Sequence, residues 1–367
     1  MPGLKNAFWN SISADPYGSR FVALQLLGLL LAAALLFRYS AREQRVRSLI
    51  NLIVCLAVGS ALFGLLRQTT QHVVGFGLPM LKPNQGYGQF INKNHFAFLM
   101  EMAFGLLLGL VVAGGVKRDR ILVYCTGLIP IWTALVLSNS RGGLIAMLAQ
   151  VISVVLLFKL VVPIVGSDSP MIRVVSLVPV RGALLLLLIA GIVVGMLWLG
   201  GDRLASNIEA ARNEFENPKI SAREAVRRKD IWLATWPMFR DHPIAGVGIG
   251  GYWAAIPTYH QASGTMTPQQ AHNDYLELLA SGGIIGIILI GWFAFVLVQK
   301  TWANLTSTDR FRRASSFGAS IAIIGVAVHS LVDFGLHLTV NALVFVALIV
   351  IAAGNFKIAR GSQREVA

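Results

Sequence analysis

Charged side chains are scarce in this sequence, and cysteine is almost absent. Asp, Glu, Lys and Arg make up 13% of the 367 residues and hydrophobic residues 55%, whereas a soluble domain carries about 25% charged residues. This composition excludes a soluble enzyme, a disordered chain and a coiled coil. The two cysteines, Cys55 and Cys125, lie inside apolar stretches, so the sequence offers neither a disulfide framework nor a Cys-rich metal site. The mean hydropathy of +0.67 indicates a polytopic membrane protein.

Long apolar stretches occupy most of the chain. A helix needs about 20 mostly apolar residues to cross a bilayer core of about 30 Å. We expect transmembrane helices over residues 21–37, 48–66, 95–115, 121–137, 143–165, 182–200, 283–299, 315–332 and 339–354. The sequence therefore predicts an all-α polytopic membrane protein with about nine transmembrane helices.

The basic residues mark one face of the membrane. More than half of the 31 Lys and Arg side chains lie in the connections after the first, third, fifth, seventh and ninth spans, and short loops rich in Lys and Arg stay cytoplasmic. The net charge of +14 therefore reflects the orientation of the chain in the membrane. Nucleic-acid binding is a poor interpretation of this charge. With nine spans the N-terminus would lie outside, which indicates either helices upstream of this sequence or one miscounted span.

The opposite face carries the one long hydrophilic segment, residues 201–282. The predicted organisation is thus N-terminal transmembrane helices over 1–200, a periplasmic helical loop over 201–282, and C-terminal transmembrane helices with a cytoplasmic tail over 283–367. Long loops on a rigid scaffold commonly carry binding and catalytic residues. We expect the chemistry in this loop.

Tryptophans accompany the first strongly helical part of the loop. Trp232 and Trp236 follow the basic residues Arg227–Lys229. Tryptophan is enriched where membrane meets water. We expect a helix here that lies along the outer surface of the bilayer.

A glycine-rich segment follows that helix. Residues Gly246–Gly251 spell G-x-G-x-x-G, but no strand precedes them and no acidic residue follows on a strand to hold a ribose, which excludes a dinucleotide fold. A tight backbone bend, with amide groups facing an anion, is the better interpretation.

His272 stands near the end of the loop. Counting by three and four places His272, Leu276 and Gly283 on one helical stripe, with the histidine one or two turns outside the membrane. Such a histidine is either a hydrogen-bonded interfacial residue or part of a site. Asp274 and Glu277 also have two interpretations: they lie on a solvated helix face, or they pair with a neighbouring arginine.

Ionisable residues also occur at membrane depth, where they are costly and often functional. Arg141 interrupts two apolar stretches and belongs either to a site or to an ordinary external loop. His329 and Asp333 are spaced i, i+4 at the end of the eighth span. They form either a structural cap or a pair of catalytic groups. Lys93 is either an interfacial lysine or a phosphate contact.

All of these groups are predicted to gather at the outer leaflet. A cluster of cations there fits an anionic lipid head group, because a guanidinium matches a phosphate bidentately. No convincing metal-ligand spacing accompanies them, so charge neutralisation would depend on arginine. The members of this predicted cluster are Lys93, Arg141, Arg228, His272 and His329.

Six short motifs stand in order along the predicted external face. They are Phe90-Ile-Asn-Lys-Asn-His95, Ser138-Asn-Ser-Arg-Gly-Gly143, Arg228-x3-Trp232, Asp241-His-Pro-Ile-Ala-Gly-Val-Gly-Ile-Gly250, His272-Asn-x9-Gly283-x2-Gly286 and His329-Ser-Leu-Val-Asp-Phe334. Each motif is weak by itself, but together they resemble the O-antigen ligase/O-antigen polymerase superfamily of bacterial envelope glycan enzymes.

This resemblance implies an integral membrane glycosyltransferase with a GT-C-like helical fold. Members use glycans carried on undecaprenyl diphosphate and need neither a metal nor another cofactor. The likeness also implies that Arg141 and Arg228 correspond to the diphosphate-binding arginines of the family. His272 would match the histidine of the family's His-Asn/Ser/Gln-x9-Gly motif.

We therefore expect transfer of a glycan from undecaprenyl diphosphate to an acceptor hydroxyl on the periplasmic side of the bacterial inner membrane. Arginines would stabilise the leaving diphosphate, and His272 would take the acceptor proton or donate a hydrogen bond to phosphate. The predicted catalytic residues are His272, Arg228 and Arg141, and the predicted substrate-binding residues are Lys93, Asn94, His95, Asn273, His329 and Asp333.

Several alternatives stay open. The acceptor is lipid A core in lipopolysaccharide synthesis, another glycan repeat, or a protein, and the sequence does not distinguish these. Outside this enzyme class, the chain fits a transporter for an anionic solute, although no internal repeat supports that reading. It also fits a non-catalytic component of an envelope glycan assembly complex.

Overall fold

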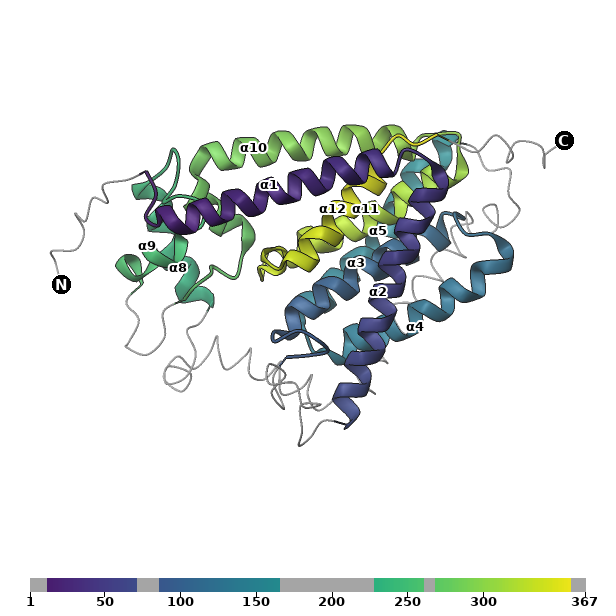
Figure 1. Ribbon diagram of the computed structural model, residues 1–367, viewed down its shortest axis with the longest axis horizontal. Helices are drawn as coiled ribbons and strands as arrows, with labels where there is room; N and C mark the ends of the chain where they lie inside the picture. Colours follow the sequence, from purple (N-terminus) through teal and green to yellow (C-terminus); the bar gives the residue numbers. More distant parts are fainter. Residues whose placement is uncertain (1–11, 71–85, 166–227, 261–267, 358–367) are drawn as a thin grey trace. The chain divides into compact units, whose positions relative to one another are not determined.

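The computed structural model describes residues 12–70, 86–165, 228–260 and 268–357, which form helices with no extended strand among them (Figure 1). The helices are α1 (Pro16–Tyr39), α2 (Glu43–Thr70), α3 (Lys93–Val112), α4 (Ile121–Leu137), α5 (Arg141–Val165), α8 (Arg228–Asp241), α9 (Tyr252–Tyr259), α10 (Asp274–Leu305), α11 (Arg310–His329) and α12 (Thr339–Ala353), with 3₁₀ turns at Arg118–Arg120 and Gly335–His337.

Six of these helices, α1, α2, α3, α5, α10 and α11, are long and apolar enough to cross a membrane. The helices α4 and α12 are apolar but shorter. Eight of the nine predicted spans overlap one of these helices. The remaining predicted span, 182–200, lies outside the described residues. The protein is therefore an all-α polytopic membrane protein, as the composition predicts.

The chain divides into two compact units. The first comprises Met1–Leu31, Ala205–Val296 and Ser330–Phe334, and the second comprises Ala32–Leu204, Leu297–His329 and Gly335–Ala367. The first unit thus contains most of the predicted external loop, and the second contains most of the transmembrane helices. The three-part division predicted from the sequence stays a prediction.

In the first unit, α8 packs against α9, and Ala280 near the start of α10 joins their core (Figure 1). The buried side chains of α8 are Ile231, Ala234, Thr235 and Met238. Their spacing of three and four residues is the period of a helix with one buried face. A small core forms on this face, and its other members include Val247, Tyr252, Ile256 and Ala280.

The glycine-rich segment makes the predicted bend and packs against α10. Gly246 has φ 67°, and a Cβ there would overlap the backbone of Ser281, so only glycine fits. The amide of Val247 donates to Ala280 O at 2.9 Å, and that of Gly246 to His242 O at 3.0 Å. These two amides donate to carbonyl groups of the protein itself. The prediction that amides of this segment face an anion is therefore wrong for Gly246 and Val247.

The same segment completes a break in α10. Gly283 has the non-helical dihedrals φ 57° and ψ −156°, which free the amides that follow. Ile284 N donates to Pro243 O at 2.8 Å, and Ile285 N donates to Ile244 O at 3.2 Å. The turn after α8 thereby satisfies amides that the helix itself leaves open.

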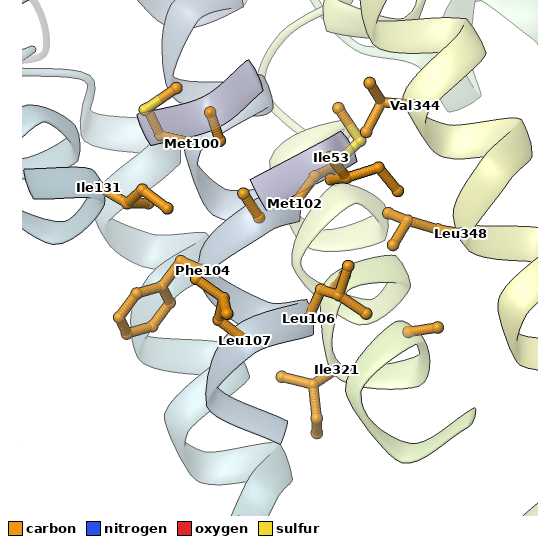
Figure 2. Packing of buried hydrophobic residues seen from close by; sticks show 14 of the residues in the cluster. Ile53, Met100, Met102, Phe104, Leu106, Leu107, Ile131, Ile321, Val344 and Leu348 are labelled. Carbon is orange, nitrogen blue, oxygen red and sulfur yellow. The ribbon is translucent and has the colours of Figure 1, made fainter. Parts of the chain in front are cut away.

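In the second unit, α3 is the central helix. Its side chains from Phe96 to Leu107 are all buried, and a helix that is hydrophobic all round is one enclosed by neighbours. Figure 2 shows Met100, Met102 and Leu106 among side chains of the surrounding helices. A Cβ on Gly109 would lie 2.5 Å from Gly318 Cα, so paired glycines let α3 and α11 approach closely.

Candidate functional site

Three predicted site residues meet in the first unit. Asp333 Oδ2 lies 3.6 Å from Arg228 Nη2, and Asp333 Oδ1 lies 3.4 Å from His272 Nδ1. The carboxylate is 1% exposed, while Arg228 and His272 are 38% and 32% exposed. We call these three residues the Asp333 cluster. Its buried member is the anion and its two accessible members are cationic or can become so.

The partners of Asp333 keep it ionised. Burial by itself would raise the pKa of this carboxyl, but the hydrogen bond with His272 and the charge of Arg228 outweigh it and lower the pKa to about 2. The backbone amide of Phe334 adds a third interaction at 2.9 Å. A fixed negative charge therefore lies behind the arginine and the histidine.

His272 has a backbone conformation that only glycine adopts easily, with φ 50°. Its Nδ1 faces Asp333, and its ring stands edge-on to Phe334 with centroids 4.8 Å apart. The nitrogen that remains for a ligand is Nε2. A carboxylate at Nδ1 fixes the orientation of the ring and stabilises its protonated form, which is the arrangement that a general base requires.

His272 does not lie on a helical stripe with Leu276 and Gly283, so that prediction is wrong. Asn273 is the reason, because its Oδ1 accepts hydrogen bonds from Tyr275 N at 3.1 Å and Leu276 N at 3.0 Å. A side chain in this role starts a helix, and α10 begins at Asp274. Asn273, predicted to bind substrate, caps α10 and sets the histidine just outside it.

Side chains bind both peptide groups of Ala271, the residue before His272. Trp232 Nε1 donates to Ala271 O at 2.9 Å, and Ala271 N donates to Glu277 Oε2 at 2.8 Å. The sequence predicts Trp232 at the membrane interface and leaves Glu277 between two roles. Neither was linked to His272, since such a link follows from the loop geometry and not from spacing.

The other predicted residues lie in the second unit. Arg141 is the first residue of α5 and is exposed. Lys93, Asn94 and His95 form the first turn of α3 and are half-buried. Asn92 caps this turn by accepting a hydrogen bond from Asn94 N at 2.9 Å. The shared location of these residues with the Asp333 cluster stays a prediction.

His329 is enclosed within the second unit. Its Nδ1 lies 2.8 Å from Glu101 Oε2, and the two side chains are 1% and 0% exposed. The imidazole stacks on Phe98 with centroids 4.0 Å apart. Because α11 ends at His329, the i, i+4 pairing with Asp333 is not helical. Sequence analysis missed Glu101, although a carboxylate within an apolar span is itself a signal.

Within 12–70, 86–165, 228–260 and 268–357, no group of three or more His, Cys, Asp or Glu side chains is arranged to hold an ion. The cation that contacts Asp333 together with His272 is the guanidinium of Arg228.

Part of the chain is similar to a known protein family. Residues 126–291 match a family model described as O-antigen ligase. The matched range contains Arg141, Arg228 and His272, whereas Asp333 lies beyond it. No curated protein matches the chain.

Proposed function

From the membership of residues 126–291 in the O-antigen ligase/polymerase superfamily, we propose that this chain transfers a glycan from undecaprenyl diphosphate to an acceptor hydroxyl. The active face is the periplasmic face of the bacterial inner membrane, and the acceptor is a glycan, lipid A core or a protein. Positive side chains take the charge-neutralising role that a metal ion has in other glycan transferases.

The observation that carries this proposal is the Asp333 cluster. A sugar transfer from a diphosphate needs one group to accept a proton and another to bind the departing anion. His272 and Arg228 are suited to these roles, and both contact one buried carboxylate. This contact fixes their separation before substrate arrives, which is the preorganisation that lowers a barrier.

The bond changes follow from these roles. The acceptor oxygen forms a bond to the anomeric carbon, and the bond from that carbon to the diphosphate oxygen breaks. The electron pair leaves with the diphosphate, whose charge Arg228 stabilises. The acceptor proton passes to His272 Nε2, and Asp333 stabilises the resulting imidazolium across Nδ1.

Arg228 keeps donors for the diphosphate although it binds Asp333. A guanidinium has five N–H groups, and the contact with Asp333 involves Nη2. Arg141, Lys93, Asn94 and His95 stay the residues that the sequence predicts as further contacts of the donor. Charge-assisted hydrogen bonds of this kind are about twice as strong as neutral ones.

The test uses purified protein in proteoliposomes with an undecaprenyl-diphosphate-linked glycan and an acceptor. His272→Ala is expected to lower kcat by about 10²- to 10⁴-fold, the usual contribution of a proton-transferring group. Arg228→Ala is expected to lower kcat/KM for the donor as well. The control is Arg240→Ala, which removes an exposed arginine from the last turn of the same helix.

Each result bears on the proposal. Transfer lost in the two variants and retained in Arg240→Ala supports it. Full transfer by His272→Ala and Arg228→Ala contradicts it. Uptake of labelled anionic solute by the same vesicles without any glycan product would replace it with the transporter alternative.

A further inference from the structure

Ala271, the residue before His272, is bound at both of its peptide groups by side chains from different helices. Trp232 on α8 donates to Ala271 O, and Glu277 on α10 accepts from Ala271 N, at 2.9 and 2.8 Å. Ala271 is fully buried and Glu277 is 9% exposed, so water does not readily replace either bond. Both backbone groups of one residue are thus fixed by side chains.

These bonds act on a backbone that does not hold its conformation by itself. Left-handed dihedrals are unfavourable for a residue with a Cβ, and His272 has φ 50°. Such a residue stays left-handed only where its surroundings determine the backbone. The peptide of Ala271 is the part of those surroundings that directly precedes His272.

The C-terminal side of His272 is fixed as well. Asn273 caps α10, and Asp274 N donates to Ser330 O at 2.9 Å. Ser330 belongs to the five-residue segment that also carries Asp333. The backbone around His272 is therefore tied to the segment that holds its carboxylate partner.

The helix that carries Trp232 and the side chain of Glu277 are themselves held in place. Thr235, one turn after Trp232 on α8, donates to Ile231 O at 2.8 Å, so its contact of 2.6 Å with Tyr252 has the tyrosine as donor. This buried bond joins α8 to α9. Gln270, with its amide nitrogen toward Glu277, donates to both carboxylate oxygens at 2.6 and 3.1 Å.

We infer that Trp232 and Glu277 are positioning residues for His272: by binding the two peptide groups of Ala271, they hold the histidine in its left-handed conformation with Nδ1 on Asp333. They touch neither the donor nor the acceptor. This inference rests on the proposed function, in which His272 takes the acceptor proton. Loosening the Ala271 peptide lets the ring leave Asp333 while the arginines remain able to bind the diphosphate.

The kinetic test compares matched variants. Trp232→Phe keeps an aromatic ring but removes the indole N–H, and Trp236→Phe makes the same change at a half-exposed position of the same helix. Glu277→Gln keeps an oxygen that accepts from Ala271 N, and Glu277→Ala does not. We expect Trp232→Phe and Glu277→Ala to lower kcat by about 10- to 10²-fold, the cost of displacing a reacting group by about 1 Å, with KM for the donor unchanged.

The second readout needs no glycan transfer. Diethyl pyrocarbonate modifies accessible histidine nitrogens, and peptide mass spectrometry gives the rate at His272. We expect this rate to rise in Trp232→Phe and Glu277→Ala and to equal that of the unchanged protein in Trp236→Phe and Glu277→Gln. Size-exclusion profiles in detergent verify that each variant is folded.

The outcomes separate this inference from the proposed function. If Trp232→Phe matches Trp236→Phe in both kcat and modification rate, the positioning role is wrong. Equal losses in Glu277→Gln and Glu277→Ala also overturn it. If His272→Ala transfers glycan at full rate, the proposed function is wrong, while the modification rates still report whether Trp232 and Glu277 hold the histidine.

Discussion

The Nδ1 of His272 lies 3.4 Å from Oδ1 of Asp333, a residue 61 positions away in the chain. The carboxylate contributes no surface of its own, since it is 1% exposed. It acts through the two side chains that it contacts, and a change at Asp333 therefore tests both of them.

Asp333→Asn is expected to lower glycan transfer by about 10²-fold or more. The amide keeps the shape of the side chain but removes the charge that stabilises a protonated His272, and it also weakens the contact with Arg228. The measurement is kcat in proteoliposomes. Asp119→Asn, in the exposed connection between α3 and α4, is the control, and equal rates in the two variants would contradict the role of Asp333.

The contribution of Asp333 to stability is expected to be constant at neutral pH and to disappear in acid. The pKa of this carboxyl falls from 3.8 in an ordinary setting to about 2 in the folded protein, so the folded state binds its proton less readily than the unfolded state. The resulting stabilisation, about 2 kcal/mol, is complete above pH 4 to 5 and disappears as the pH falls toward 2. Melting temperatures of the protein and of Asp333→Asn should converge over that interval and differ by a constant amount at neutral pH.

The buried pair of Glu101 and His329 predicts a non-additive effect on stability. Glu101→Leu leaves His329 Nδ1 without its acceptor in the core, which costs about 1–3 kcal/mol. Replacing both partners together, with Glu101→Leu and His329→Phe, removes the need for the bond and is expected to cost less than either change alone. Thermal unfolding in detergent measures the three variants, and strictly additive losses would show that the two side chains act independently.

Two glycines of the first unit predict opposite outcomes for the same substitution. Gly246→Ala places a Cβ against the backbone of Ser281 at φ 67°, which is expected to cost at least about 1–2 kcal/mol. Gly291→Ala, inside α10 with open space around it, is expected to be neutral or to stabilise by up to about 1 kcal/mol. Melting temperatures test the pair, and equal shifts would refute the steric argument.

The sequence predicts the helices of this protein well because apolar length is a local property. Eight described helices overlap predicted spans, and the buried positions of α8 follow a helical period. The bend at Gly246–Gly251 is likewise predictable, since left-handed backbone favours glycine. These features depend on residues close together in the chain.

The sequence marks the three members of the Asp333 cluster as candidates, but it does not give their contacts. His272, Arg228 and Asp333 were all singled out, yet Asp333 was paired with His329, which instead contacts Glu101. The reason is that α11 ends between the two, so helical spacing no longer applies. The left-handed His272 was also missed, because the capping role of Asn273 outweighs the apolar stripe that seemed to continue through it.

The break in α10 at Gly283 makes the extramembrane turn part of the membrane helix. Two amides at the top of that helix donate to Pro243 and Ile244. If the turn were pulled away, these amides would face hydrocarbon, where no water replaces a lost bond. Insertion of α10 into a bilayer therefore favours a folded turn, and the surrounding lipid helps to keep the turn after α8 attached to α10.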